Sequence, residues 1–248
     1  MGSLDGRVAI VTGAGQGIGR AIAEGLSAEG ARIVVADLRG AGEAAAAFPD
    51  GVGITADVAN EADVQRLADT VVERCGTIDI LVNNAGLYAS IPMRSFLEIP
   101  LDEWRQVMDV NVASMFLTCR AVVPIMKAAG GGKIVNISSG TPFRGVPFLL
   151  HYVTSKGAIV AFTRALAKEV GRDGVLVNCV APGFTMSAGV EQHPEVVEAL
   201  QQASVSSRTL QRDQVPEDVV GAVVYLAGAS SSFVTGQTIV IDGGQYFH

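Results

Sequence analysis

Seven short runs rich in β-branched residues recur along the chain, and stretches with helical periodicity separate them. The runs cover residues 7–12, 31–37, 51–56, 78–83, 132–138, 174–180 and 237–242. Most of them are continuously apolar rather than alternating, which is typical of strands covered on both faces in a parallel sheet. Strands that alternate with helices predict right-handed βαβ crossovers. We therefore expect an α/β fold: a doubly wound, seven-stranded parallel sheet with helices on both faces.

No linker and no internal repeat interrupts this pattern, so residues 1–248 are predicted to form a single domain. One segment, 183–214, interrupts the regular alternation of predicted strands and helices. It has weak helical periodicity and no predicted strand. A long irregular segment in a compact domain is usually functional or mobile. Because this segment follows the end of a strand, we expect a lid over a substrate. A solvated surface excursion is the alternative.

Composition excludes several classes of protein. The chain is 49% hydrophobic with a formal net charge of −7, so neither disorder nor a basic surface for nucleic acid is expected. No run of 18 apolar residues and no signal peptide is present, so no membrane association is expected. Cys75, Cys119 and Cys179 lie far apart without metal-ligand spacing. This predicts reduced thiols, no metal site and a cytoplasmic protein.

A glycine-rich loop follows the first predicted strand and opens a helix, with the sequence TGAGQGIG over 12–19. Glycines at this spacing let the backbone approach a pyrophosphate, whose charge faces the N–H groups at the helix start. Because the loop opens the first βαβ unit, it predicts a Rossmann-type dinucleotide site. The residues predicted to contact the dinucleotide here are Gly13, Gln16, Gly17, Ile18 and Gly19.

Acidic residues follow the second and third predicted strands. Asp37 ends the second strand, where a carboxylate accepts hydrogen bonds from the adenosine ribose and repels a 2′-phosphate. Arg39 could instead accommodate a 2′-phosphate, but Asp37 weighs more because it stands at the strand tip. Asp57 and Val58 follow the third strand, where Asp57 could bond the adenine or cap the next helix. These residues favour NAD as the cofactor.

Tyr152 and Lys156 are four residues apart, so they share one face of a predicted helix. A nearby ammonium favours a phenolate, which would lower the pKa of Tyr152 from its ordinary value near 10. That shift would suit a general acid or base at moderate pH. Ser139, after the fifth strand, could hydrogen-bond a substrate oxygen on which charge develops.

Together these motifs resemble the short-chain dehydrogenase/reductase family over essentially the whole chain. The resemblance is carried by TGAGQGIG (12–19), NNAG (83–86), Asn111, Ser139, YVTSK (152–156), PG (182–183) and GQTIVIDGG (236–244). Each motif is moderately specific, but their order and spacing match the family throughout.

The resemblance implies a catalytic tetrad of Asn111, Ser139, Tyr152 and Lys156. Tyr152 would exchange the proton, Ser139 would orient the substrate oxygen, and Asn111 would hold a water that relays the proton through Lys156. Lys156 would also lower the pKa of Tyr152 and bind the nicotinamide ribose. Further dinucleotide contacts implied are Asn84, Ala85, Gly86, Tyr152, Lys156, Pro182, Gly183, Thr185 and Ser187. Ser187 stands where the family often has Thr and could take over its contact with the nicotinamide. Thr185 is the alternative for this contact.

The substrate pocket is expected between residues 88–94, 140–151 and the lid. Its predicted contacts are Tyr88, Ser139, Phe143, Phe148, Leu149, Tyr152, Phe184 and Met186. His151 is expected to be a helix-start or surface residue, and only Arg94 and Arg144 supply cations nearby. Apolar walls around one polar focus suit a carbinol flanked by hydrocarbon, so an aromatic or alicyclic secondary alcohol or its ketone is the predicted substrate.

The sequence therefore predicts an NAD-dependent oxidoreductase acting on a small-molecule alcohol or ketone. A 3-oxoacyl-carrier-protein reductase of the same family is the alternative; Gln16, Asp37 and the run LYAS at 87–90 disfavour it. A catalytically silent nucleotide-sensing protein is a remote alternative, because the Asn/Ser/Tyr/Lys set is intact. The resemblance further implies a homotetramer. Its interfaces would use the helix over 100–129 with that over 151–170, and the helix over 216–229 with the final strand.

Overall fold

The computed structural model of the chain describes residues 2–247, with every side chain among them except that of residue 199. One parallel sheet holds seven strands in the order β3-β2-β1-β4-β5-β6-β7, which confirms the predicted fold class. The strands are β1 (Val8–Thr12), β2 (Arg32–Asp37), β3 (Val52–Thr55), β4 (Ile80–Asn83), β5 (Gly132–Ile137), β6 (Val175–Pro182) and β7 (Thr238–Ile241).

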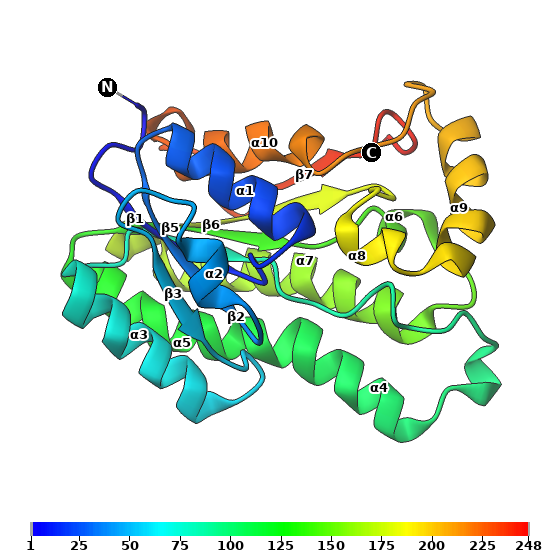
Figure 1. Cartoon of the computed structure of the whole chain (residues 1–248), viewed down its shortest axis with the longest axis horizontal. Helices are drawn as coiled ribbons and strands as arrows, with labels where there is room; N and C mark the ends of the chain where they lie inside the picture. Colours follow the sequence, from blue (N-terminus) through cyan, green and yellow to red (C-terminus); the bar gives the residue numbers. More distant parts are fainter. Residues whose placement is uncertain (1, 248) are drawn as a thin grey trace.

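Helices cover both faces of this sheet. Figure 1 shows α1 (Gly17–Ala28) and α10 (Glu217–Ala227) on one face, and α3 (Glu61–Cys75), α5 (Ser114–Ala128) and α7 (Leu150–Val170) on the other. Four further short helices are α2 (Ala41–Ala45), η1 (Phe96–Glu98), η3 (Gly171–Asp173) and η4 (Ala229–Ser231).

Strand β1 explains why its run is continuously apolar. Ala9 and Val11 pack in the cluster formed with α1 and α10, whereas Val8 and Ile10 pack in the cluster formed with α3, α5 and α7. Successive side chains of a strand point to opposite faces, so both sets must be apolar. Ile10 is fully buried, and truncation of such a side chain to Ala typically costs about 2–5 kcal/mol.

The predicted long helix over 100–129 consists of three pieces. These are α4 (Leu101–Met108), the π-helical turn η2 (Asp109–Ala113) and α5, which follow one another directly. By length and composition alone the span Leu101–Ala128 could cross a membrane, a property shared with core helices, and 39% of its most apolar window is buried in the fold. Met115, Cys119, Val122 and Met126 supply buried contacts from α5.

The segment 183–214 is more regular than its sequence indicated. It contains α8 (Ala188–Glu191) and α9 (Pro194–Ser206), and a single isolated bridge joins Thr185 to Gln214. Pro194 occupies the first turn of α9, where its fixed φ and missing N–H suit a helix start. The expectation of an irregular segment is therefore wrong for its central part. In Figure 1, α8 and α9 lie beside α6 (Thr141–Arg144), at one end of the sheet.

The strand order reverses direction at β1. This strand pairs with β2 on one side and with β4 on the other, both in parallel register. A crevice forms at such a switch point, outside the carboxyl ends of the strands, and it is where open α/β sheets bind ligands. We therefore expect a ligand site at the loops after β1 and β4.

Candidate active site

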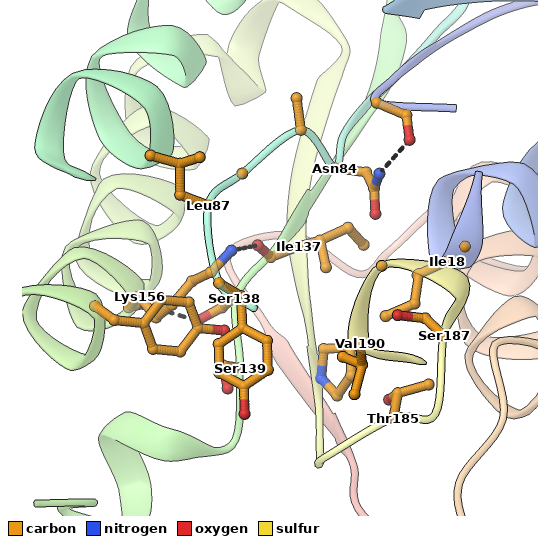
Figure 2. A pocket seen from close by; sticks show the side chains of 18 of the residues that line it. Ile18, Asn84, Leu87, Ile137, Ser138, Ser139, Lys156, Thr185, Ser187 and Val190 are labelled. Carbon is orange, nitrogen blue, oxygen red and sulfur yellow. Dashed lines mark hydrogen bonds between the residues drawn. The ribbon is translucent and has the colours of Figure 1, made fainter. Parts of the chain in front are cut away.

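A cavity of about 610 Å³ opens at the carboxyl edge of the sheet, and the loops after β1, β2, β3, β4, β5 and β6 line it. Every residue predicted to contact the dinucleotide lines this cavity: Gly13, Gln16, Gly17, Ile18, Gly19, Asp37, Asp57, Val58, Asn84, Ala85, Gly86, Tyr152, Lys156, Pro182, Gly183, Thr185 and Ser187. Figure 2 shows Ile18, Ser187 and Val190 across the cavity from Ser139 and Lys156.

The glycine loop forms a cradle that side chains would fill. Gly13 and Gly17 adopt φ of +65° and +57°, the left-handed region that favours glycine. A Cβ added to Gly13 would lie 2.9 Å from the Cα of Ala85, and one added to Gly19 would lie 2.3 Å from the Gly13 carbonyl oxygen. The bare backbone at the start of α1 fits a pyrophosphate group.

Asp37 is held at the tip of β2 by backbone donors. Its Oδ2 accepts a hydrogen bond of 2.9 Å from the N–H of Gly15, and its Oδ1 accepts one of 3.3 Å from the N–H of Arg39. Asp37 lines the cavity, whereas the exposed Arg39 is not among the lining residues. Asp37 therefore borders the cavity, and Arg39 does not.

Asp57 also lines the cavity, but it does not cap the helix that follows. Its Oδ1 accepts a hydrogen bond of 2.9 Å from the N–H of Ala59. The side chain of Asn60 caps α3 instead, accepting from the N–H of Asp63. The capping role considered for Asp57 therefore belongs to Asn60.

The loop after β4 is tied to the glycine loop by one threonine and one asparagine. The Nδ2 of Asn84 donates to the carbonyl oxygens of Thr12 and Gly13 at 3.0 and 3.1 Å (Figure 2). The backbone N–H groups of Asn84 and Ala85 both donate to the hydroxyl of the buried Thr12 at 3.0 Å. These bonds fix the two loops that meet at the switch point.

Ser139, Tyr152 and Lys156 meet in the middle of the cavity. Tyr152 and Lys156 come from α7, and the Ser139 side chain lies close enough to the Tyr152 hydroxyl to affect its pKa. The Nζ of Lys156 donates to the carbonyl oxygen of Ile137 at 3.0 Å (Figure 2). The same Nζ lies 5.8 Å from the centroid of the Tyr152 ring. The structure thus brings together three of the four predicted catalytic side chains.

Asn111, the fourth, lies behind the cavity wall in the π-helical turn and is fully buried. Its Nδ2 donates to the hydroxyl of Ser155 at 3.0 Å and to the carbonyl of Leu87 at 3.2 Å, while its Oδ1 accepts from the N–H of Leu87 at 2.7 Å. A Cβ added to Gly86 would meet Asn111 Oδ1 at 3.0 Å and Lys156 Nζ at 3.5 Å. Both side chains therefore border the space that a side chain at position 86 would fill.

Burial governs the protonation of the central pair. It raises the pKa of Tyr152 to about 12, although the hydrogen bond with Ser139 lowers it. Burial also lowers the pKa of Lys156 to about 8. The pKa of Tyr152 is therefore raised and not lowered as expected, because burial of the phenol outweighs the other effects on it.

The predicted substrate contacts divide into two groups. Tyr88, Ser139, Leu149, Tyr152 and Phe184 line the cavity. The ring of Tyr88 lies 4.9 Å from that of Tyr152 and 6.5 Å from that of Phe184, centroid to centroid. An aromatic wall therefore stands beside the central hydroxyls.

Phe143, Phe148 and Met186 do not line this cavity. Phe143 stacks on Tyr246 at 5.8 Å and borders a separate groove. Phe148 is 56% exposed in a left-handed backbone conformation. Met186 stands between two cavity-lining residues of an extended segment, Thr185 and Ser187, and alternation turns it to the other side. The prediction that these three residues contact the substrate therefore has no support from the cavity lining.

Further lining residues come from within the ranges expected to form the pocket, 140–151 and 183–214, and from outside them at Gln106, Val110 and Gln245. Gln106 and Val110 come from α4 and the π-helical turn, and Leu200, Ala203 and Ser204 come from α9. Their i, i+3 and i+4 spacings are the signal that marks one helix face. Thr141, Arg144, Val146, Gly189, Val190 and Gln245 also line the cavity.

His151 is fully buried, so its prediction as a helix-start or surface residue is right only for its place at the start of α7. Its Nε2 lies 3.0 Å from Oε1 of Glu103, whose Oε2 lies 3.3 Å from Nη2 of Arg94. Arg94 therefore faces a carboxylate of the fold, and it does not line the cavity.

Cys119 and Cys179 are buried and Cys75 is half-buried, with no disulfide among them. Burial raises the pKa of the Cys119 and Cys179 thiols to about 12 and about 11. Among residues 2–247, no cluster of three or more His, Cys, Asp or Glu side chains is placed to hold a metal ion.

Comparisons with known proteins cover nearly the whole chain. A family model described as Enoyl-(Acyl carrier protein) reductase matches residues 13–246. A protein described as a ketoacyl reductase of the granaticin polyketide synthase of Streptomyces violaceoruber is 38% identical over 96% of each chain. The L-2,3-butanediol dehydrogenase of Corynebacterium glutamicum is 36% identical over 98% of this chain and 99% of its own.

The solved structures agree with this result. A crystal structure described as a short-chain dehydrogenase/reductase from Burkholderia xenovorans superposes with a TM-score of 0.90 at 33% identity, covering 99% of this chain and 98% of that one. The chain therefore belongs to the short-chain dehydrogenase/reductase family, oxidoreductases that act on CH–OH groups with a nicotinamide dinucleotide.

Proposed function

We propose that this enzyme transfers a hydride between NAD(H) and a secondary alcohol or its ketone, with an aromatic or alicyclic substrate. One observation carries the proposal. Ser139, Tyr152 and Lys156 converge in a cavity that also holds Asp37, and Tyr88, Leu149 and Phe184 wall the space beside them. The pocket thus combines a proton-exchanging group, a dinucleotide cradle and an apolar substrate wall.

Preference for NAD over NADP is supported by Asp37 and Gln16. A carboxylate fixed at the tip of β2 accepts hydrogen bonds from ribose hydroxyls and repels a 2′-phosphate. The residues that would hold the dinucleotide are those of the glycine loop, the loop after β4, Lys156 and the stretch Pro182–Ser187, and when bound it supplies or accepts the hydride.

Tyr152 acts as the general acid in the reducing direction and as the general base in the oxidising direction. Its burial keeps the phenol protonated, which suits proton donation to a carbonyl oxygen. The hydroxyl of Ser139 orients that oxygen and stabilises the charge that develops on it. Oxidation of an alcohol requires the phenolate, so the fraction of enzyme ready for oxidation rises with pH.

Lys156 and Asn111 support the proton transfer. The Lys156 amine is anchored by the Ile137 carbonyl and lies over the Tyr152 ring. Asn111 fixes Leu87 and Ser155, and it approaches Lys156 across Gly86. We infer that Asn111 orders the water that passes a proton to and from Lys156.

The segment 183–214 serves as the lid of this site. Leu200, Ala203 and Ser204 of α9 line the cavity opposite α7, where closure would exclude water from the reacting atoms. We further propose that the enzyme is a cytoplasmic homotetramer, with interfaces formed by α4–α5 with α7 and by α10 with β7.

Reduction of a carrier-linked 3-oxoacyl group is the second candidate. It is favoured by the 38% identity to a protein described as a ketoacyl reductase. A silent nucleotide-sensing role is not favoured, because Ser139, Tyr152 and Lys156 all line the same cavity.

Steady-state formation of NADH across a panel of alcohols tests the proposal. We expect the highest kcat/KM for 1-phenylethanol and cyclohexanol-type substrates, because buried hydrocarbon contributes about 25 cal/mol per Å². The highest value for a polyol, an ethanol-sized alcohol or a short hydroxy acid would contradict the substrate class. Efficient NADPH-dependent reduction of 3-oxoacyl thioesters alone would favour the second candidate.

A further inference from the structure

Arg144 reaches the cavity from the element that also holds Ser139 in place. Ser139 follows β5 and accepts a hydrogen bond of 3.2 Å from the N–H of Thr141, the first residue of α6. Arg144 stands three residues later, so it shares a helix face with Thr141, and both line the cavity. Arg144, an exposed residue, thereby lies at the Ser139 end of the site.

Arg144 differs from the other charged residues that line the cavity. Asp37 and Asp57 stand at the ends of β2 and β3, at the dinucleotide end. Lys156 is buried, its pKa is lowered to about 8, and its amine is bonded to a backbone carbonyl. An arginine, by contrast, stays charged at all ordinary pH values. Arg144 is therefore the permanent cation among the described lining residues.

Arg144 has no counter-ion in the part of the chain that the structure describes. The described ion pairs leave it out, whereas Arg94 is paired with Glu103. The charge that Arg144 interacts with is a like charge: it helps to lower the pKa of Arg208, which has Asp213 and Asp242 to offset it. Arg144 thus carries a positive charge that no ion pair within residues 2–247 offsets.

We propose that Arg144 forms a subsite for an anionic group at the remote end of the substrate. A ligand that fills the cavity displaces the water around the guanidinium, so the charge then favours an oxyanion from the ligand. The ligand class is a ketone or secondary alcohol with an apolar body that ends in a carboxylate or phosphate. This inference rests on the proposed function and makes its substrate class more specific.

The subsite and the apolar wall select different parts of one molecule. Tyr88, Leu149 and Phe184 contact the hydrocarbon beside the reacting carbon, and Arg144 contacts the terminal oxyanion. A hydroxy acid of a few carbons lacks the apolar body, so it remains a poor substrate. Two sources supply the same chemistry: the carboxylate of a free oxo acid, or a phosphate of the pantetheine arm in an acyl thioester.

The test compares each oxo acid with its own methyl ester. 4-Acetylbenzoate and methyl 4-acetylbenzoate differ only in the charge at the remote end, and acetoacetyl-coenzyme A provides the phosphate arm. We expect wild-type kcat/KM for the acid to exceed that for the ester by about tenfold, the range of a charge-assisted hydrogen bond. Arg144→Gln should bring the ratio near one, and Arg144→Lys should retain part of it. Salt should reduce the wild-type ratio, because the site is open to solvent.

Arg105→Gln is the matched control, because Arg105 is an exposed cation of α4 that does not line the cavity. It should leave the acid-to-ester ratio unchanged. Binding of the same pair to the enzyme–NADH complex, followed by NADH fluorescence, gives the ratio without turnover.

The subsite is overturned if the acid-to-ester ratio of kcat/KM is the same in wild type and Arg144→Gln, and if kcat/KM for the thioester is also the same in both. If the esters are reduced well at the same time, the proposed function stands and only the subsite fails. An Arg144-dependent advantage for the thioester but not for the free acid would identify the phosphate as the oxyanion.

Discussion

The Nε2 of His151 lies 3.0 Å from Oε1 of Glu103 and joins the first turn of α7 to α4, one residue before Tyr152. The other oxygen of Glu103 faces Arg94, whose backbone N–H donates to the carbonyl of Phe148 at 2.9 Å. Three elements around the candidate proton donor are therefore tied together by one partly buried carboxylate. This arrangement makes Glu103 and His151 structural supports of the site.

Replacement of His151 by Leu should destabilise the fold, because it leaves part of the Glu103 carboxylate without a partner. We expect a loss of about 1–3 kcal/mol in the free energy of unfolding. The chain offers a matched control in His193, which pairs with Glu195 at 3.2 Å on the surface. His193→Leu should change stability by less than about 0.5 kcal/mol. Urea unfolding of both variants measures the difference, and equal losses would show that burial of the pair does not matter.

Tyr152→Phe removes the proposed proton-exchanging hydroxyl and keeps the ring that packs on Tyr88. Positioned proton transfer contributes about 10²–10⁴-fold to rate, so we expect at least that loss in kcat. The Kd for NADH, measured by fluorescence, should stay within about threefold of wild type, a change below ~1 kcal/mol. Turnover within a few-fold of wild type would remove Tyr152 from the mechanism.

The two directions of the reaction should depend on pH with opposite sign. Alcohol oxidation needs the Tyr152 phenolate, and burial raises the pKa of this phenol to about 12, so kcat for oxidation should rise with pH from 7 to 10. Ketone reduction needs the protonated phenol and a proton supply through Lys156, whose pKa is lowered to about 8. Its rate should fall as the pH rises above about 8. A maximum for oxidation below pH 7 would contradict this assignment.

Cofactor choice should depend on Asp37. We expect wild type to prefer NAD over NADP by at least about tenfold in kcat/KM, equal to about 1.4 kcal/mol. Asp37→Ser removes the charge that repels a 2′-phosphate, so the preference should shrink or reverse. Glu43→Ser, on the nearby helix α2 but outside the cavity, is the control that should leave it unchanged. Equal use of both cofactors by wild type would contradict the prediction.

Local features of the chain were readable from the sequence. The strands carry continuous apolar runs because helices bury both faces of the sheet, and the glycine loop and the Tyr152–Lys156 pair each lie within one short segment. Their chemistry follows from spacing alone, since neighbours in a loop or helix stay neighbours in the fold.

Features decided by distant contacts were not readable. His151 is buried because of Glu103, 48 positions away. Phe143 lies outside the cavity and stacks on Tyr246, near the end of the chain. The pKa of Tyr152 depended on how deeply α7 packs, which its composition does not reveal. In α9 the apolar contrast between faces is weak, so its helix was missed although its residues favour one.

Assembly into a tetramer should depend on apolar side chains that the single chain leaves exposed. Phe116 of α5 is 50% exposed, Tyr225 of α10 is 40% exposed, and Phe233, just before β7, is fully exposed. Large apolar groups exposed on or next to the expected contact elements favour burial against further copies of the chain. Light scattering of wild type should give about four times the chain mass of 25.7 kDa.

Phe116→Glu and Phe233→Glu should each break a different two-fold interface and yield dimers, because a buried unpaired carboxylate is costly. Val72→Glu is the control: it places the same charge on α3, outside both interfaces, and should leave the mass unchanged. A single-chain mass for wild type at micromolar concentration would refute the assembly.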